Sequence, residues 1–149
     1  FAELGPLRDM IRITTTHPDR PVVEIAGHIN VIPRILSRSR VISLGFVRPG
    51  VPRPPMRARI QPGVPGVNFS IERVEVVPRT GREVPAGGVG FEAVSGKDAR
   101  GWWVDVKYDG KSRRQGLIEA ELVVHTDDAE QPEVRVPIRA TIRAPARSR

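Results

Sequence analysis

The chain repeats itself, and this repeat limits what it can fold into more than any other feature. Thr15 and Pro21 recur as Thr126 and Pro132, a constant separation of 111 residues without insertion or deletion. Apolar residues keep the same register: the matched pairs are Leu7 with Ile118, Ile11 with Leu122, Ile13 with Val124, Val23 with Val134 and Ile25 with Val136. Similarity at a fixed period is the signature of tandem structural repeats. We therefore expect the last two strands of one module to occur twice.

Short runs rich in valine and isoleucine lie between the 14 glycines and 15 prolines, a pattern typical of a sandwich or barrel. The separation of the two copies is close to the roughly 100 residues of an immunoglobulin-like domain. We predict an all-β fold, with an immunoglobulin-like β-sandwich over residues 29–143. It is preceded by the terminal β-hairpin of a preceding similar module in residues 1–28, and followed by a tail or linker at 144–149. The expected strands are residues 10–15, 22–31, 41–47, 56–60, 69–77, 89–94, 102–108, 117–126 and 132–143.

Alternation along these strands predicts which side chains face the core. Two tryptophans adjoin, and we expect Trp102 to point inward and Trp103 outward. A change of phase within 69–77 predicts a β-bulge near Glu72 or Arg73. The side chains expected to face inward on the strand at 41–47 are Ile42, Leu44 and Phe46.

Length and composition narrow the classes of protein. With 149 residues the chain can build one good core and is too short for two ordinary domains. The repeat suggests a piece of a longer array, and because the chain begins with Phe1 without a basic start or an apolar run, we expect any secretory signal to be already absent from it. No run approaches the roughly 18 apolar residues of a membrane span, so no membrane insertion is expected. The absence of cysteine excludes disulfides, thiolate metal sites and cysteine nucleophiles.

The formal charge of +7 comes almost wholly from arginine, since Lys97, Lys107 and Lys111 are the only lysines. Such a bias is consistent with an anionic partner. Genomic base composition produces the same preference, so charge alone does not decide between the two.

The repeated segments also resemble a known family. Residues 31–33, 42–50 and 122–138 are similar to a bacterial repeat family of unknown function, related to the Hydin-like and major-sperm-protein-like immunoglobulin folds, and residues 11–19 resemble the closing strand of a preceding copy. The resemblance implies an exported, tandem and non-enzymatic module. Many members carry a Cys-x-Cys-like element after the third strand, where this chain has Val76 to Gly81 and no cysteine.

Residues able to do catalysis are few. His17, His28 and His125 do not match one another in the repeat, which argues against a shared catalytic or metal role. The best hydrolase hypothesis combines His125 with Asp127 or Asp128, and no nucleophile lies beside them in the sequence. Together with Glu130, these two aspartates could also offer oxygen ligands to calcium, although Asp in such a turn normally caps backbone N–H groups. The glycines around Gly87 precede a strand rather than a helix, so a flexible turn is favoured over a phosphate loop.

Arginines line the outward faces of two expected strands, and one tryptophan shares that orientation. Guanidinium groups beside an exposed aromatic ring can bind carboxylates, phosphates or a protein partner. Alternatively, arginine stems cover the sheet and pair with acidic residues across strands, which we favour. The candidate interaction residues are Arg57, Arg59, Trp103, Arg135, Arg139 and Arg143.

These patterns favour a non-catalytic structural or protein-interaction module of a longer, exported tandem-repeat protein, located in the periplasm or cell envelope. We expect no cofactor, no metal and no catalytic residue. The alternative is a basic module that binds an anionic polymer such as a polysaccharide, a lipid headgroup or, less favoured, nucleic acid. Because a lone two-stranded hairpin is marginal, we expect the N-terminal hairpin to pack on the complete module or to self-associate with a second copy.

Overall fold

The computed structural model describes residues 5–79, 88–111 and 115–143, which form ten β-strands and, within these ranges, no helix. The chain divides into two compact units, Phe1–Pro33 and Arg34–Arg149. β2 stays paired with β1 as far as Val31, so the division falls later than the boundary expected after residue 28. The predicted tail at 144–149 and the glycine Gly87 lie outside the described residues.

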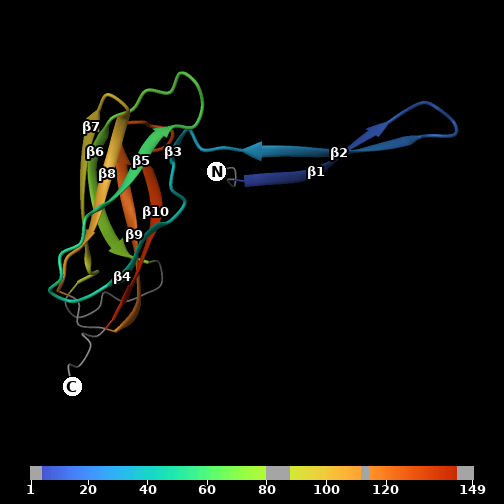
Figure 1. Ribbon diagram of the computed structural model, residues 1–149. Helices are drawn as coiled ribbons and strands as arrows, with labels where there is room; N and C mark the ends of the chain where they lie inside the picture. The colour runs from blue at the N-terminus through green and yellow to red at the C-terminus, as the bar shows by residue number, and fades with distance from the viewer. Residues whose placement is uncertain (1–4, 80–87, 112–114, 144–149) are drawn as a thin grey trace. The chain divides into compact units, whose positions relative to one another are not determined.

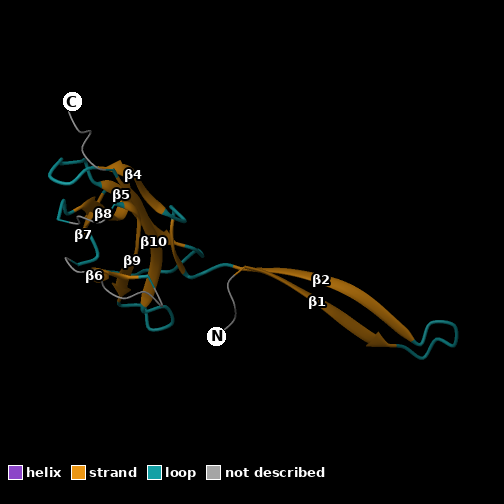
Figure 2. Ribbon diagram, turned by 90° about the horizontal axis from the view of Figure 1, so that it is seen from below, coloured by secondary structure: helices purple, strands orange, loops and turns teal. Residues whose placement is uncertain are grey.

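Eight strands of the second unit form two four-stranded sheets, which face each other as two layers (Figures 1 and 2). One sheet has the strand order β4-β10-β9-β6 and the other β3-β5-β8-β7. The strands are β3 Ile35–Ser37, β4 Ile42–Val47, β5 Met56–Pro62, β6 Ile71–Pro78, β7 Phe91–Asp98, β8 Gly101–Tyr108, β9 Gly116–Thr126 and β10 Glu133–Ile142.

One edge of the sandwich is shared between the two layers. β3 pairs with β5 in one sheet, and β4, the next strand along the chain, pairs in parallel with β10 in the other. The remaining pairs within each sheet are antiparallel. With β5, β8 and β7 in one layer and β6, β9 and β10 in the other, this is the immunoglobulin-like plan with a split first strand. The predicted fold class is confirmed.

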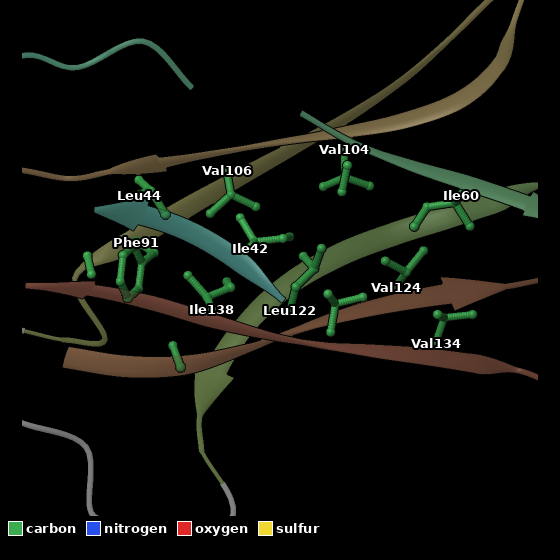
Figure 3. Close-up of a cluster of buried hydrophobic side chains, with 14 of the residues drawn as sticks. Ile42, Leu44, Ile60, Phe91, Val104, Val106, Leu122, Val124, Val134 and Ile138 are labelled. Atoms are coloured by element: carbon green, nitrogen blue, oxygen red, sulfur yellow. The ribbon is translucent and has the colours of Figure 1, made fainter. Parts of the chain in front are cut away.

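The core lies between the two layers, because strand alternation puts one apolar face of each sheet inward. Figure 3 shows Val104 and Val106 of β8 on one side of the core, with Leu122 and Ile138 of β9 and β10 on the other. All four side chains are buried. Trp102 packs against this cluster and its indole N–H donates to the Phe69 carbonyl oxygen at 3.1 Å, which satisfies the one polar atom that its burial removes from water.

The expected inward orientation of Phe46 is wrong. Its side chain is 54% exposed, while Val47, the next residue, is buried. The cause is an irregularity in the pairing of β4 with β10, where Arg139 opposes Ser43 but Ala140 opposes Gly45. Gly45 has a φ of 66°, a left-handed conformation that glycine adopts without steric cost. This bulge reverses the alternation after Leu44 and turns the aromatic ring to the surface.

A second irregularity agrees with the sequence. Pairing of β6 with β9 shifts between Ile71 and Arg73, which confirms the bulge expected near Glu72 or Arg73. The short strand β3 was not expected, because three residues are too few to show a period of two. Its existence depends on pairing with β5 rather than on its own sequence.

The first unit is a two-stranded antiparallel hairpin of β1 Gly5–Thr14 and β2 Val22–Val31, drawn in blue in Figure 1. Its register repeats that of the β9–β10 hairpin at the separation of 111 residues. Ile11 opposes Ile25 just as Leu122 opposes Val136, and Ile13 opposes Val23 just as Val124 opposes Val134. The two hairpins therefore share one pairing geometry from end to end.

The turns of the two hairpins also share their hydrogen bonds. The Thr15 N–H donates to the Pro21 carbonyl at 2.9 Å, as the Thr126 N–H does to Pro132 at 2.9 Å. The Thr15 hydroxyl donates to the Arg20 carbonyl, as the Thr126 hydroxyl does to Gln131. A threonine-based turn of this kind fixes hairpin length and register, so the repeat in sequence is also a repeat in conformation.

Candidate functional site

The six predicted interaction residues do not form one surface. Arg57 and Arg59 on β5 and Trp103 on β8 lie on the outer side of the β3-β5-β8-β7 sheet, where we call them the tryptophan face. Three further arginines follow β10 on the outer side of the other sheet: Arg135, Arg139 and Arg143. The sandwich core separates the two groups, so one ligand does not contact both at once.

The tryptophan face is neutralised by its own carboxylates. Arg57 donates from Nε and Nη2 to the two oxygens of Asp105, both at 2.7 Å. Arg59 likewise donates from Nη1 and Nη2 to the two carboxylate oxygens of Asp98, at 2.7 and 2.8 Å. Because these donors are already occupied in the strongest geometry available to arginine, the face offers little free charge to an anion.

These pairs shift the ionisation of their members. The hydrogen bonds from Arg59 lower the pKa of Asp98 to about 2, and the Arg100 backbone N–H adds to this effect. The hydrogen bond with Asp105 raises the pKa of Arg57 above its usual value. The Arg59–Asp98 pair therefore remains ionised over the physiological pH range.

Trp103 faces outward as expected, but its ring lies against the sheet. The Arg57 guanidinium lies over the ring, 4.0 Å from its centroid, and Gly96 of β7 lies directly against the ring. A side-chain carbon on Gly96 would come within 3.0 Å of three ring atoms. The absence of a side chain at Gly96 thus leaves space for the Trp103 ring. The ring covers the β7 backbone there and is half-buried.

Arg135 is also compensated. Its guanidinium contacts Glu121 at 3.1 Å and Glu133 at 3.0 Å. It opposes Val123 across the β9–β10 pair, and this valine is only 1% exposed although it points away from the core. The arginine stem and the neighbouring side chains cover the valine, which is the role of a solvated sheet surface.

His125 and the aspartates of the neighbouring turn are held in separate contacts. His125 lies between two glutamates, with Nε2 2.6 Å from Glu75 and Nδ1 3.7 Å from Glu133. Asp127 accepts from the Ser70 N–H at 2.6 Å, and Asp128 accepts from the backbone of Glu130 and Gln131 and pairs with Arg34. The aspartates thus cap the turn. In the described ranges, no three His, Asp or Glu side chains are grouped as a metal ion requires.

The remaining two arginines differ from the others. Arg139 is exposed and opposes Glu119 across the β9–β10 pair, but Glu119 pairs with Arg79, and Arg139 forms no ion pair with any residue that the structure describes. Arg143 likewise forms no ion pair with a carboxylate in the described ranges. The Arg143 guanidinium instead lies 3.5 Å from the centroid of the Phe46 ring. Thr141 lies between the two arginines on β10. It opposes Phe46 of β4 on one side and Leu117 of β9 on the other.

We call Phe46, Leu117, Arg139, Thr141 and Arg143 the β10 patch. Phe46 and Leu117 are 54% and 53% exposed, so the patch combines two uncompensated charges with apolar surface. The sequence pointed to its arginines but missed Phe46, because only the bulge at Gly45 turns that ring outward. The glycine in the middle of an apolar strand was the signal that could have indicated it.

A hollow of about 360 Å³ lies between the loop after β4 and the turn after β8. Its lining includes Arg53, Glu92, Lys107 and Tyr108. Lys107 pairs with Glu92 at 3.0 Å, and burial raises the pKa of Tyr108. The Arg53 guanidinium donates to the Leu44 carbonyl and so covers part of the free edge of β4. Lys107, Glu92 and Arg53 are thus already held in contacts within the module, as in a structural loop contact.

The fold is an all-β immunoglobulin-like sandwich, and the candidate binding residues lie on the outer faces of its two sheets. No family model matches the chain, and no curated protein matches it. No helix in the part of the chain that the structure describes has the length and apolar character needed to cross a membrane. The resemblance to the bacterial repeat family therefore rests on its quoted residues and stays a prediction.

Solved structures with some similarity are extracellular cadherin repeats. Protocadherin gamma C5 EC1-3 matches with a TM-score of 0.49 and 10% identity, over 93% of this chain and 43% of that one. Protocadherin gamma B7 domains 1-4 gives 0.47 and 10%, over 92% and 32%. Mouse clustered PcdhgC3 EC1-3 gives 0.46 and 12%, over 94% and 43%. The chain spans less than half the length of these three, and its fold is assigned from its own strand order.

Proposed function

We propose that the chain is a non-catalytic interaction module of an exported tandem-repeat protein, and that it binds a protein partner through the β10 patch. The observation that carries this proposal is the Arg143 guanidinium stacked on an exposed Phe46 ring, beside the uncompensated Arg139. Arginine and aromatic side chains supply much of the binding energy at protein interfaces. The other predicted arginines are neutralised in place, so they are the less available surface.

The composition of the patch favours a protein over an anionic polymer. A polymer that binds by counterion release needs on the order of 6–10 phosphate contacts for a strong salt dependence. The β10 patch offers two guanidinium groups without an ion pair, and its two exposed apolar side chains release no counterions from a polyanion. A partner surface with a carboxylate and an apolar residue would use all of them.

Site-specific photocrosslinking in cells that produce the parent protein tests the proposal. A benzophenone side chain at position 117 is expected to give one crosslinked protein species, and the same probe at position 57 on the tryptophan face is expected to give none. Arg139→Glu with Arg143→Glu should abolish the product at 117 because both variants repel an acidic partner. A product at 117 that survives both substitutions contradicts the proposed recognition.

The anionic-polymer alternative is tested on the purified chain. Retention on heparin is expected to be weak, and Arg139→Ala with Arg143→Ala should leave the eluting salt concentration nearly unchanged. A large loss of retention in this double variant, together with an affinity that falls steeply with salt, would instead favour polymer binding.

A further inference from the structure

One face of the β1–β2 hairpin is apolar and exposed, although the equivalent face of β9–β10 is the core of a sandwich. Leu122 is fully buried, whereas its counterpart Ile11 is 55% exposed. We call this set of residues the hairpin core face; its members are Leu7, Asp9, Ile11, Ile13, Val23, Ile25, Gly27 and Ile29. Their counterparts are Ile118, Ala120, Leu122, Val124, Val134, Val136, Ile138 and Ala140, all of which are buried.

The complete unit shows what covers such a face. β5 and β8 lie across the core from β9 and β10, β6 lies along β9, and β4 lies along β10. All of these strands precede the β9–β10 hairpin in the chain. Since register and turn are the same in both hairpins, the equivalent cover for β1–β2 is polypeptide that precedes Gly5.

We propose that the hairpin core face is covered by a preceding stretch of the same polypeptide, folded as β3 to β8 are folded here. This deepens the proposed function, because it rests on the tandem arrangement and names the partner of this face. The hairpin supplies the closing strands of that earlier module.

Two positions of the hairpin core face, Asp9 and Gly27, indicate which side chains the covering strands carry. Asp9 opposes Gly27 where the complete unit has Ala120 opposite Ile138. A carboxylate at such a depth requires hydrogen-bond donors, and within the hairpin Asp9 accepts only from the neighbouring Met10 N–H at 2.8 Å. The covering strands therefore carry a donor opposite Asp9 and a large side chain over Gly27.

The cover is consequently not identical to β3–β8 of this module. Of the inward side chains of β5 and β8 here, Ala58, Ile60, Val104 and Val106 cannot donate to a carboxylate, while Trp102 and Tyr108 carry donors but pack in a core built around Ala120 and Ile138 rather than around Asp9 and Gly27. The burial of the Asp9 carboxylate and the space left at Gly27 would thus penalise docking of β1–β2 onto a copy of this module. Such a penalty keeps each hairpin with its own module in an array whose modules share one geometry.

The turn gives a second, independent indication. In the complete unit Asp128 binds Arg34, and the Gln131 amide exchanges hydrogen bonds with the backbone of Ile35 at 2.9 and 2.7 Å. The corresponding turn positions in the hairpin are His17 and Arg20. Because a base replaces the acid there, the cover should present a carboxylate where this module presents Arg34.

A chain that carries its own cover tests the proposal. Residues 1–4 are replaced by a second copy of residues 34–115, which preserves the separation between copies, and amide hydrogen exchange of β1–β2 is measured with β9–β10 as internal reference. In a version that also carries Asp9→Ala and Gly27→Ile, we expect β1–β2 amides to exchange at least ~100-fold more slowly than in the parent chain. The version with native Asp9 and Gly27 should show much less protection.

Adjacent residues on opposite faces provide a matched control, since Ile11 and Met10 are 55% and 56% exposed. In the fused chain with the two substitutions, Ile11→Asp should abolish the protection and Met10→Asp should retain it. Equal loss in both variants would overturn the assignment of the face.

Other outcomes also decide the matter. If both fused chains leave β1–β2 at the exchange rates of the parent, the proposed cover is wrong. Protection of the parent chain that rises with protein concentration, with a dimer mass by light scattering, would assign the face to a second copy and overturn the proposal. Equal protection with and without the two substitutions would refute the donor opposite Asp9. Crosslinking at the β10 patch is measured on different residues, so its failure is distinguishable from these results.

Discussion

At the scale of single residues, the carboxylate that each arginine reaches decides what the arginine can do. Arg57 pairs with Asp105 on the adjacent strand β8, and Arg59 reaches past β8 to Asp98 at the end of β7, so both guanidinium groups form two-point pairs. Arg143 has an aromatic ring beside it instead. The same residue type therefore stabilises one sheet and leaves charge available on the other.

The Arg59–Asp98 pair predicts a pH dependence of stability. The folded protein lowers the pKa of Asp98 to about 2 from its usual 3.8, so this carboxylate stabilises the fold above its unfolded pKa, and the contribution is lost as pH falls through the folded value. Asp98→Asn should therefore flatten the decline in unfolding free energy between about pH 4 and pH 2. Urea unfolding at a series of pH values measures this, and parallel curves for the two proteins would contradict it.

Gly96→Ala should destabilise the complete unit by about 1–3 kcal/mol, because the new methyl group overlaps the Trp103 ring and the backbone beneath it cannot yield. Denaturant unfolding measures the loss. In a Trp103→Ala background the same substitution should cost much less. A double-mutant cycle without coupling would show that the ring and the glycine are independent.

At the scale of elements, the β9–β10 turn holds the start of its own module. The Gln131 side chain continues the ladder beside Ile35 like a short strand, while Arg34 pairs with Asp128 at 3.0 Å and with Glu130 at 3.3 Å. The pairing with Arg34 lowers the pKa of Asp128. This turn thus connects two segments that are far apart in sequence. Its hydrogen bonds to Ile35 explain where β3 begins.

Gln131→Ala should destabilise the complete unit by about 1–3 kcal/mol, because it leaves the Ile35 N–H and carbonyl without their partners. Hydrogen exchange at the Ile35 amide should rise at the same time. Gln61→Ala, at an exposed position of β5, is the control and should change neither measurement. Unchanged exchange at Ile35 in the Gln131 variant would show that the Gln131 side chain does not protect β3 from exchange.

At the scale of the whole molecule, two hairpins of one geometry have opposite surroundings. β9–β10 is part of a core built from both sheets, whereas the equivalent apolar side chains of β1–β2 are exposed. Stability should therefore be distributed unequally along the chain, with the second unit unfolding cooperatively and the hairpin contributing little to that transition.

Equivalent substitutions in the two hairpins test this distribution. Leu122→Ala should cost about 2–5 kcal/mol, because it removes a fully buried side chain from the core. Ile11→Ala, at the equivalent position of the repeat, should leave the main unfolding transition unchanged within about 0.5 kcal/mol. Denaturant unfolding followed by tryptophan fluorescence reports on the second unit, where both tryptophans lie. Equal losses would show that the hairpin core face is already covered in this chain.

Local pattern and the sequence repeat determined the strands other than β3, the fold class and the bulge in β6, because both can be read from the sequence without any tertiary contact. The same pattern pointed to Arg139 and Arg143 but not to their difference from Arg57 and Arg59. Only tertiary pairing places Asp105 and Asp98 within reach of Arg57 and Arg59, whereas Glu119, which opposes Arg139, pairs with Arg79. It also decided that Gly45 turns Phe46 outward and that Gln131 holds β3 in place. These features join residues distant in the chain, and such contacts exist only once the two sheets have packed.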